Sequence, residues 1–214
     1  MTRTGGAVYW DLDGTLTDPK KGITESIQYA LHELGLPVPP ADDLTWCIGP
    51  ALLWSFEQLG APDPEAALAH YRTAYTGKGM FDCTVYDGIL EALTEIGARH
   101  QMHLATAKPH AYAKKITAHY GIAPHMTQEF GPELDGTRND KGALLAHALT
   151  ITGNDPAKSV MVGDRHYDLK AARDVGMKFI AVGWGYGGAD DLSAADAFVK
   201  TPGELATAVR DLIG

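Results

Sequence analysis

The sequence predicts an α/β protein in which helices cover both faces of a parallel β-sheet and a small helical region is inserted near the start. Short apolar runs alternate with helical patterns of about 10–12 residues, an order typical of parallel strands joined by crossover helices. Residues 19–81 break this alternation, because they contain three helical patterns and no convincing strand. The 45% hydrophobic content of the 214 residues suffices for a sizeable core.

Each element of the expected core follows from a local pattern. The expected strands are short apolar runs bounded by turn-forming residues, and they are 7–11, 102–107, 159–163, 178–182 and 197–200. The expected helices carry apolar residues at helical spacing, and they are 89–98, 111–120, 141–151, 167–175 and 204–213.

The inserted region is predicted to be a separate helical domain. Its patterns are "GITESIQYALHELGL", "PALLWSFEQLG" and "DPEAALAHYRTAYTG", and prolines punctuate them. We therefore expect a core domain formed by residues 1–16 and 83–214 and a helical cap domain formed by residues 17–82, with hinges near residues 17–19 and 81–86.

Composition excludes several classes of partner. The net charge is −9 and no basic stripe occurs, which argues against nucleic acid. No apolar run approaches the roughly 20 residues that span a bilayer, and the start "MTRTGGAVYW" has no apolar segment typical of a signal peptide. Cys47 and Cys83 fit no metal-binding spacing, so we expect reduced thiols, a cytoplasmic location and no membrane partner.

The segment "VYWDLDGTLTD" places carboxylates directly after a buried strand. Asp11 and Asp13 leave the strand on the same side, and Gly14 permits a sharp turn after them. Asp164 follows another expected strand, and Asp168 shares a helix face with it if the helix begins near residue 165. Because ligands of open parallel sheets bind at the carboxyl ends of the strands, we expect these side chains to converge.

Clustered carboxylates predict a bound cation. Desolvated carboxylates cost several kcal/mol each unless they are paired or bound to metal. Three or four of them aimed at one point suit Mg²⁺, which keeps coordination positions for water and phosphate oxygens. Thr106 and Lys108, at the end of a third expected strand, suit the remaining phosphate oxygens.

Other patterns are interpreted as structural. "GWGYGG" formally matches a dinucleotide-binding fingerprint, but no helix opens directly after it, so we expect a tight loop near the site. His100 and His103 have no metal-binding partners and are expected to flank a strand. Trp46, Trp54 and Phe56 lie at helical spacing, which favours the core of the cap.

The motifs resemble those of the haloacid dehalogenase superfamily of phosphohydrolases. "DLDGTLTD" resembles the nucleophile motif, "LATAKP" is similar to the second motif and "VGDRHYDLKAA" to the fourth. "VYDGILEAL" resembles the segment where such chains re-enter the core after a cap. The likeness covers nearly the whole chain, is closest to the phosphoglycolate-phosphatase-like branch, and implies a Rossmann-like core.

The resemblance implies a role for each matching residue. Asp11 would attack phosphorus, and Asp13 would act as general acid and base. The implied phosphate-binding residues are Thr106, Ala107, Lys108 and Gly14, and the implied Mg²⁺ site consists of Asp11, Asp13 through its main-chain carbonyl, Asp164 and Asp168. The motif lysine is Lys141 in "TRNDKGALL" or, alternatively, Lys108, because glycine follows Lys141 where many relatives have proline.

We therefore expect a Mg²⁺-dependent phosphatase that hydrolyses a small phosphorylated metabolite, similar to phosphoglycolate, through an aspartyl-phosphate, as a monomer or homodimer. Gly49 and Pro50 in "IGPALLWSF" precede a helix whose first N–H groups are candidates to bind a substrate carboxylate. The alternatives are a 5′-nucleotidase with a nucleobase stacked on Trp46 and Trp54, a phosphomutase, and a binding module without turnover.

Overall fold

The computed structural model describes residues 6–188 and 190–214. Within them the chain forms two compact units and passes between them twice. One unit contains the described residues up to Thr17 together with those of Val85–Gly214, and the other is Asp18–Thr84. The sequence pattern predicts crossings after residues 16 and 82.

The first unit is built on a six-stranded sheet with parallel strand pairing. In spatial order its strands are β5 (Gln128–Phe130), β4 (Gln101–Ala105), β1 (Ala7–Trp10), β6 (Ser159–Gly163), β7 (Lys178–Val182) and β8 (Ala197–Val199). The predicted α/β class with a parallel sheet is therefore confirmed. β1 lies inside the sheet, with a neighbouring strand on each side.

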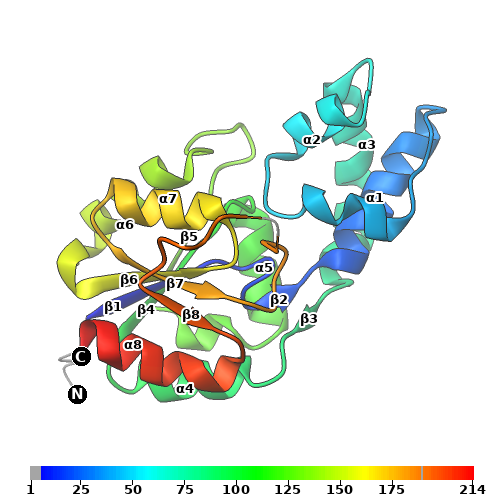
Figure 1. The fold of residues 1–214 in the computed structure, drawn as a ribbon. Coiled ribbons are helices and arrows are strands. Elements are labelled where there is room, and N and C mark those ends of the chain that lie inside the picture. Colours follow the sequence, from blue (N-terminus) through cyan, green and yellow to red (C-terminus); the bar gives the residue numbers. More distant parts are fainter. Residues whose placement is uncertain (1–5, 189) are drawn as a thin grey trace. The chain divides into compact units, whose positions relative to one another are not determined.

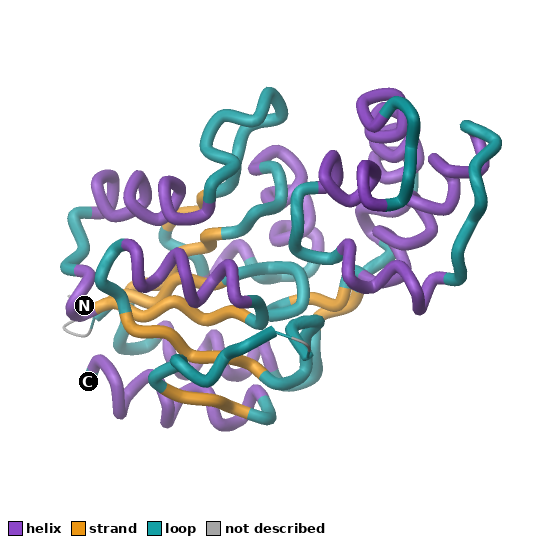
Figure 2. Tube along the Cα trace, turned by 45° about the horizontal axis from the view of Figure 1, so that its top comes forward, coloured by secondary structure: helices purple, strands orange, loops and turns teal. Residues whose placement is uncertain are grey.

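Helices cover both faces of this sheet, as Figures 1 and 2 show. Helices α6 (Lys141–Thr152) and α7 (His166–Asp174) lie on one face, whereas α4 (Ile89–Gly97) and α8 (Leu205–Ile213) lie on the other. The remaining helical segments of this unit are α5 (His110–His119), η3 (Ala123–His125), η4 (Pro156–Lys158) and η5 (Pro202–Glu204).

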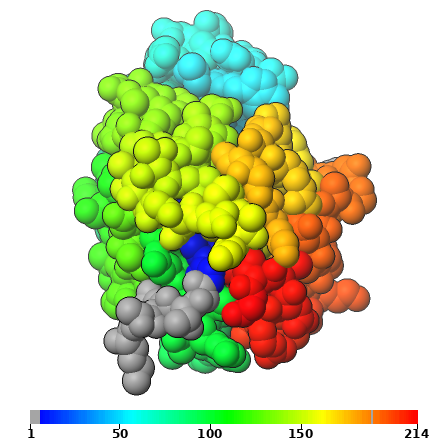
Figure 3. Space-filling model, turned by 90° about the vertical axis from the view of Figure 1, so that its left-hand side faces the viewer, coloured from blue at the N-terminus to red at the C-terminus, as the bar shows by residue number. Residues whose placement is uncertain are grey.

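β1 is enclosed within the sheet. All four of its side chains are buried, and Tyr9 packs in a core cluster with Leu145, Met161 and Phe179. In Figure 3 only a small part of the blue segment, which includes β1, is visible between the yellow segment and α8 (red). Burying side chains of this size stabilises the fold by about 1.5–3 kcal/mol each, which fixes β1 between its neighbours.

The strand register brings three strand ends to the same level. Trp10 pairs with Leu104 of β4 and with Val162 of β6. The backbone N–H of Asp11 continues this pattern by donating to the Val162 carbonyl at 2.9 Å. The residues that follow these three strands therefore emerge side by side at one edge of the sheet.

One strand of the sheet was missing from the prediction. β5 has three residues, Gln128–Phe130, and forms the outer edge next to β4. Its Gln and Glu side chains and partial exposure give no apolar run, so the sequence carries no strand pattern there. The expectation that His103 flanks a strand is also wrong. His103 lies within β4 and is 1% exposed.

The second unit is helical. It contains α1 (Lys20–Glu33), η1 (Ala41–Cys47), α2 (Leu52–Gln58), α3 (Pro64–Gly77) and η2 (Gly79–Phe81). α1 packs against α3 and approaches η2 so closely that a Cβ on Gly22 would lie 2.0 Å from the Gly79 carbonyl oxygen. Glycine at position 22 is therefore required for this approach.

Two expectations for this unit are wrong. Phe56 is fully buried, but Trp46 and Trp54 are 37% and 44% exposed, and these two rings pack against each other. In addition, proline suits the first position of a helix and Pro50 was expected there, but α2 begins at Leu52 with Ala51 as its N-cap.

The two chain crossings contain β2 (Thr17–Asp18) and β3 (Thr84–Val85), which pair as a two-stranded sheet. Among the described residues, no helix is both long enough and apolar enough to cross a bilayer.

Candidate active site

The turn after β1 is organised by one carbonyl group. The backbone N–H groups of residues 15–17 all donate to the Leu12 carbonyl oxygen, at 2.9–3.2 Å. Gly14 has a φ of 85°, a left-handed conformation that glycine adopts without strain. A Cβ at this position would lie 2.3 Å from Asp164 Oδ2, so glycine also allows the turn to approach Asp164.

Asp164 and Asp168 lie at the end of β6 and in the first turn of α7. Both are 1% exposed. Asp168 Oδ2 accepts a hydrogen bond from the backbone N–H of Arg165, the N-cap residue of α7, at 3.0 Å. Asp164 accepts from the backbone N–H of Tyr186 at 2.7 Å and from the Thr15 hydroxyl at 3.3 Å. The two carboxylates are therefore held in place by backbone and hydroxyl groups.

Asp11, Asp164 and Asp168 form a compact carboxylate cluster. Each offers one oxygen, and these oxygens lie within 4.8 Å of one another. Lys141, the first residue of α6, reaches into the cluster: its Nζ lies 2.8 Å from Asp11 Oδ1 and also contacts Asp168 Oδ1. The N-cap Asp140 fixes the start of α6 by accepting from the backbone N–H of Ala143 at 2.7 Å.

The electrostatics of the cluster follow from burial and like charge. Burial raises the pKa of Asp164 to about 7, and the nearby Asp168 and Asp11 add to this effect. Burial also raises the pKa of Asp168 to about 6, although Lys141 opposes the shift. Burial acts to lower the pKa of Lys141, but Asp11 and Asp168 outweigh it and raise that pKa. Lys141 is therefore charged, and it neutralises only part of the cluster.

A second lysine holds the other carboxylate of the β1 turn. Lys108 Nζ lies 2.6 Å from Asp13 Oδ2, and both side chains are nearly buried. Among the described residues, Asp13 Oδ1 is buried without a hydrogen-bond partner. Burial raises the pKa of Asp13 more than Lys108 lowers it. Asp13 is thus suited to hold a proton and still has one oxygen available.

Thr106 directly follows β4, beside the end of β1. It is 1% exposed, and its backbone N–H donates to the Phe130 carbonyl at 3.1 Å. Its hydroxyl oxygen accepts from the backbone N–H of Lys108 at 3.2 Å. This bond does not use the hydroxyl hydrogen, so that hydrogen is available to bind a phosphoryl oxygen.

The structure brings most of the predicted site residues to one edge of the sheet, namely Asp11, Asp13, Gly14, Thr106, Lys108, Lys141, Asp164 and Asp168. Ala107 lies between Thr106 and Lys108 in the same segment, and its side chain is exposed. Lys141 and Lys108 are not alternatives, since each contacts a different carboxylate of the β1 turn. Asp18 does not join the cluster, and it accepts from the backbone N–H of Lys20 at 3.0 Å.

Two contributors were not assigned roles from the sequence. Thr15 lies inside the nucleophile-like motif, but a hydroxyl two residues after Asp13 gives no local sign that it binds Asp164. The backbone of Tyr186 also binds Asp164. The sequence feature that indicates this contact is the glycine-rich run 183–188, which the prediction correctly placed in a loop near the site.

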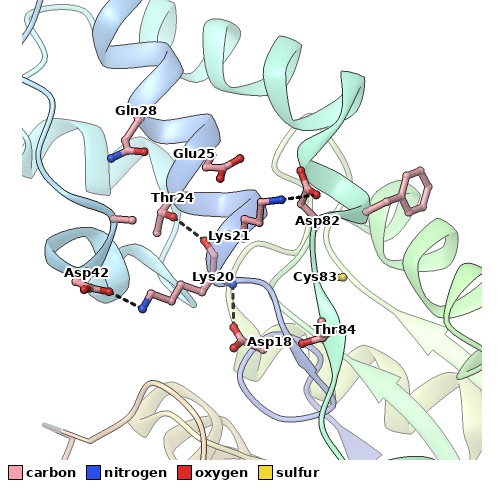
Figure 4. A pocket seen from close by; sticks show the side chains of 12 residues that line it. Asp18, Lys20, Lys21, Thr24, Glu25, Gln28, Asp42, Asp82, Cys83 and Thr84 are labelled. Carbon is pink, nitrogen blue, oxygen red and sulfur yellow. Dashed lines mark hydrogen bonds and ion pairs between the residues drawn. The ribbon is translucent and has the colours of Figure 1, made fainter.

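The second unit contains a cavity of about 620 Å³, lined by α1 and by residues near 41–42 and 81–84 (Figure 4). Lys20 Nζ lies 2.5 Å from Asp42 Oδ1, and Lys21 Nζ lies 3.1 Å from Asp82 Oδ1. Both lysines that line the cavity are therefore already neutralised by carboxylates. Unlike the nearly buried Lys108 and Lys141, both lysines are also accessible to solvent, so we do not assign the phosphate site to this cavity.

Residues 8–182 match the family model of haloacid dehalogenase-like hydrolases. The chain belongs to this family, in agreement with the resemblance of its motifs. A solved structure described as a "predicted phosphatase" from Clostridium acetobutylicum has a TM-score of 0.91 and 32% identity, and the match covers 97% of this chain and 99% of that one.

Curated relatives carry different names. The 5′-nucleotidase of Pseudomonas aeruginosa is 41% identical over 87% of this chain and 86% of its own. Tyrosine-protein kinase PtkA of Mycobacterium tuberculosis is 36% identical over 97% of this chain and 72% of its own. Phosphoglycolate phosphatase of Caulobacter vibrioides is 27% identical over 85% of this chain and 81% of its own. The family model and the relatives named as a nucleotidase or a phosphatase together identify the chain as a phosphatase.

Proposed function

We propose that this phosphatase hydrolyses a phosphomonoester in two steps, with Asp11 as nucleophile and Mg²⁺ as cofactor. The observation that carries the proposal is the convergence of Asp11, Asp164 and Asp168 around Lys141 at the carboxyl end of the sheet. A cluster of this kind is costly without positive charge. It is therefore suited to bind a cation and a phosphate together.

The donor set fits Mg²⁺. Three carboxylates face one ammonium group, which leaves two negative charges for a divalent cation to balance when all are ionised. All donors are hard oxygen atoms, the ligands that Mg²⁺ prefers. Asp11, Asp164 and Asp168 would hold the ion. When bound, it would lower the repulsion between the nucleophile and the phosphoryl oxygens.

In the first step, a carboxylate oxygen of Asp11 forms a bond to phosphorus. The bond between phosphorus and the leaving oxygen breaks, and Asp13 gives its proton to that oxygen. Lys141 holds Asp11 in place and adds positive charge beside the phosphoryl group. Thr106 donates its hydroxyl hydrogen to a phosphoryl oxygen.

In the second step, water attacks phosphorus of the aspartyl-phosphate. Asp13, now a carboxylate, accepts a proton from this water, and the bond between phosphorus and the Asp11 oxygen breaks. Inorganic phosphate leaves, and Asp11 and Asp13 return to their starting forms. Lys108 keeps Asp13 oriented through both steps.

We propose nucleoside 5′-monophosphates as the substrate class. The 5′-nucleotidase relative is more similar to this chain than the phosphoglycolate phosphatase relative. Trp46 and Trp54 meet edge to face, with ring centroids 5.8 Å apart and an interplanar angle of 89°. Both side chains are partly exposed, and stacking of a base on such a ring contributes about 1–3 kcal/mol.

A small carboxylate ester such as phosphoglycolate is the second candidate, and the lysines of the helical unit do not favour it. A substrate carboxylate needs a donor, but Lys20 and Lys21 are paired with Asp42 and Asp82. Lys78 also lies 3.6 Å from Asp82. None of these three lysines is therefore without a carboxylate partner.

The test is steady-state kcat/KM for nucleoside monophosphates, 2-phosphoglycolate and glucose 6-phosphate in one buffer with Mg²⁺. We expect a nucleotide to be preferred by at least about tenfold, with inorganic phosphate and nucleoside released in equal amounts. If phosphate were transferred to a tyrosine or sugar hydroxyl instead of water, less inorganic phosphate than nucleoside would be released. Preference for 2-phosphoglycolate would overturn the substrate class but not the mechanism.

Variants separate substrate recognition from chemistry. The double variant Trp46→Leu, Trp54→Leu should lower kcat/KM for nucleotides and leave that for 2-phosphoglycolate unchanged. Tyr29→Leu, at another exposed aromatic residue of the same unit, is the matched control. Asp11→Asn should abolish phosphate release from every ester, and retention of activity by this variant after deamidation is excluded would overturn the nucleophile assignment.

A further inference from the structure

The described residues after β7, 183–188 and Asp190, contact both halves of the proposed active site, yet none of their side chains belongs to the carboxylate cluster. They begin immediately after residue 182, where the match to the family model ends. They therefore lie outside the motifs from which the site was predicted.

The first contact is with the turn that carries Asp11 and Asp13. The indole Nε1–H of Trp184 donates to the Thr15 carbonyl oxygen at 3.1 Å. The Trp184 ring also meets Tyr86 edge to face, with centroids 6.3 Å apart. Thr15 is fully buried, and its hydroxyl donates to Asp164. A single residue of the turn is thus held by the loop and connected to the cluster.

The second contact is with Asp164 itself. The backbone N–H of Tyr186 donates to Asp164 Oδ2 at 2.7 Å. The glycines on both sides of Tyr186 make this approach possible. A Cβ on Gly185 would lie 2.3 Å from the Gly14 carbonyl oxygen, and one on Gly187 would lie 1.7 Å from the Asp164 carbonyl oxygen. Side chains at these two positions would displace the loop from Asp164.

The far end of the loop is fixed to the start of α7. Asp190 Oδ2 accepts from Arg165 Nε at 2.8 Å and from the backbone N–H of His166 at 2.9 Å. The His166 ring nitrogen Nδ1 also lies 3.0 Å from this oxygen. Arg165 and His166 directly follow Asp164 in the chain, so this anchor acts next to the carboxylate that Tyr186 binds.

We propose that residues 183–188 together with Asp190 form a positioning element that holds the nucleophile turn and Asp164 in register. Trp184 and Asp190 are its positioning residues, and Tyr186 acts through its backbone. The inference rests on the proposed roles of Asp11 and Asp164. It assigns a role to a loop that contains none of the proposed reacting groups, because such reactions depend on preorganised geometry as well as on chemical groups.

The experiment compares three conservative variants of the full chain. Trp184→Phe removes the indole N–H but keeps an aromatic ring next to Tyr86. Asp190→Asn weakens the anchor to Arg165 and His166. Asp191→Asn is the matched control, because it is the same change in the next residue, whose exposed carboxylate accepts only from Ser193 in the described contacts.

Steady-state kcat and KM are measured with Mg²⁺ and p-nitrophenyl phosphate, and hydrogen exchange is measured separately. We expect Trp184→Phe and Asp190→Asn to lower kcat by at least about tenfold and to change KM by less than about twofold, since a misplacement of about 1 Å can cost about 10²-fold. We also expect faster hydrogen exchange of the peptide covering residues 12–17 in Trp184→Phe. The control variant should match the wild type in both measurements.

A kcat within about twofold of the control for folded Trp184→Phe and Asp190→Asn would overturn the proposal. Unchanged exchange of residues 12–17 in Trp184→Phe would also overturn it. A loop with a merely structural role would lower the melting temperature without lowering kcat of the folded protein. If the wild type hydrolyses no ester, the proposed function fails, and the exchange measurement alone then decides whether the loop holds the turn.

Discussion

Lys108 and Asp13 form a buried ion pair with an Nζ–Oδ2 distance of 2.6 Å, separate from the contact of Lys141 with Asp11. Each lysine thus contacts one of the two carboxylates of the β1 turn. One stabilises the proposed nucleophile, and the other orients the proposed acid and base. This division makes their variants distinguishable.

Lys108→Met should lower kcat by about 10²-fold or more, because Asp13 loses the partner that orients it. KM should change much less. Lys115→Met, an exposed lysine on α5, is the control. Steady-state kinetics measure both constants, and a kcat of Lys108→Met equal to that of the control would refute the orienting role.

Asp13→Asn should reduce hydrolysis of esters with poor leaving groups more than hydrolysis of aryl phosphates. An alkoxide needs a proton as it leaves, and a lost general acid costs about 10²–10⁴-fold, whereas a nitrophenolate leaves unaided. The ratio of kcat for an alkyl phosphate to kcat for p-nitrophenyl phosphate measures this. Equal losses on both substrates would contradict general acid catalysis by Asp13.

Mg²⁺ should raise the melting temperature of the wild type in the absence of substrate. The cluster exists only in the folded chain, so the ion stabilises that state by mass action. Asp164→Asn, which replaces one donor oxygen, should need a higher Mg²⁺ concentration for the same rise. Thermal denaturation with increasing Mg²⁺ after chelation checks this, and a melting temperature indifferent to Mg²⁺ would remove the metal from the proposal.

In the presence of a chelator, the wild type should lose stability as the pH rises from about 5 to about 8. Burial raises the carboxyl pKa of Asp164 to about 7 and that of Asp168 to about 6. The folded chain therefore retains protons that the unfolded chain has already released, and this stabilising difference disappears as the pH rises through those values.

Asp164→Asn is the comparison for this pH effect, because it removes one of the two titrating groups. Its melting temperature should depend less on pH, and it should exceed that of the wild type at about pH 8 in the chelator. Parallel curves for the two proteins would show that Asp164 does not titrate in this range.

Gly22→Ala should destabilise the helical unit by about 1–3 kcal/mol, because the added Cβ would lie 2.0 Å from the Gly79 carbonyl oxygen. Gly77→Ala, in α3, is the control, since a Cβ there meets no atom within 4 Å. It should be neutral or stabilising by up to about 1 kcal/mol. Denaturant unfolding of both variants tests this, and equal stabilities would contradict the close approach of α1 to η2.

The sequence was sufficient to predict the fold class and the strand ends that carry the site. The alternation of apolar runs and helical patterns is local, and so are the spacings that place Asp11 with Asp13 and Asp164 with Asp168. A short edge strand such as β5 was missed, since three partly exposed residues contain no hydrophobic pattern.

The partners of the site residues were decided only by the tertiary structure. The sequence left Lys108 and Lys141 as alternatives, whereas the packing of α6 and the position of β4 assign each to its own carboxylate. Trp46 and Trp54 have the helical spacing of core residues but lie at the surface of their unit. Periodicity specifies which side of an element a residue occupies, but not what covers that side.

The sequence by itself therefore determined the elements, their order and the carboxylates at the end of β1 and β6, because each depends on residues close together in the chain. The tertiary structure alone decided that Trp184 and Tyr186 reach Thr15 and Asp164. Such contacts depend on strand register and on close backbone approach at Gly185 and Gly187, which join segments far apart in the sequence and leave no periodic pattern in it.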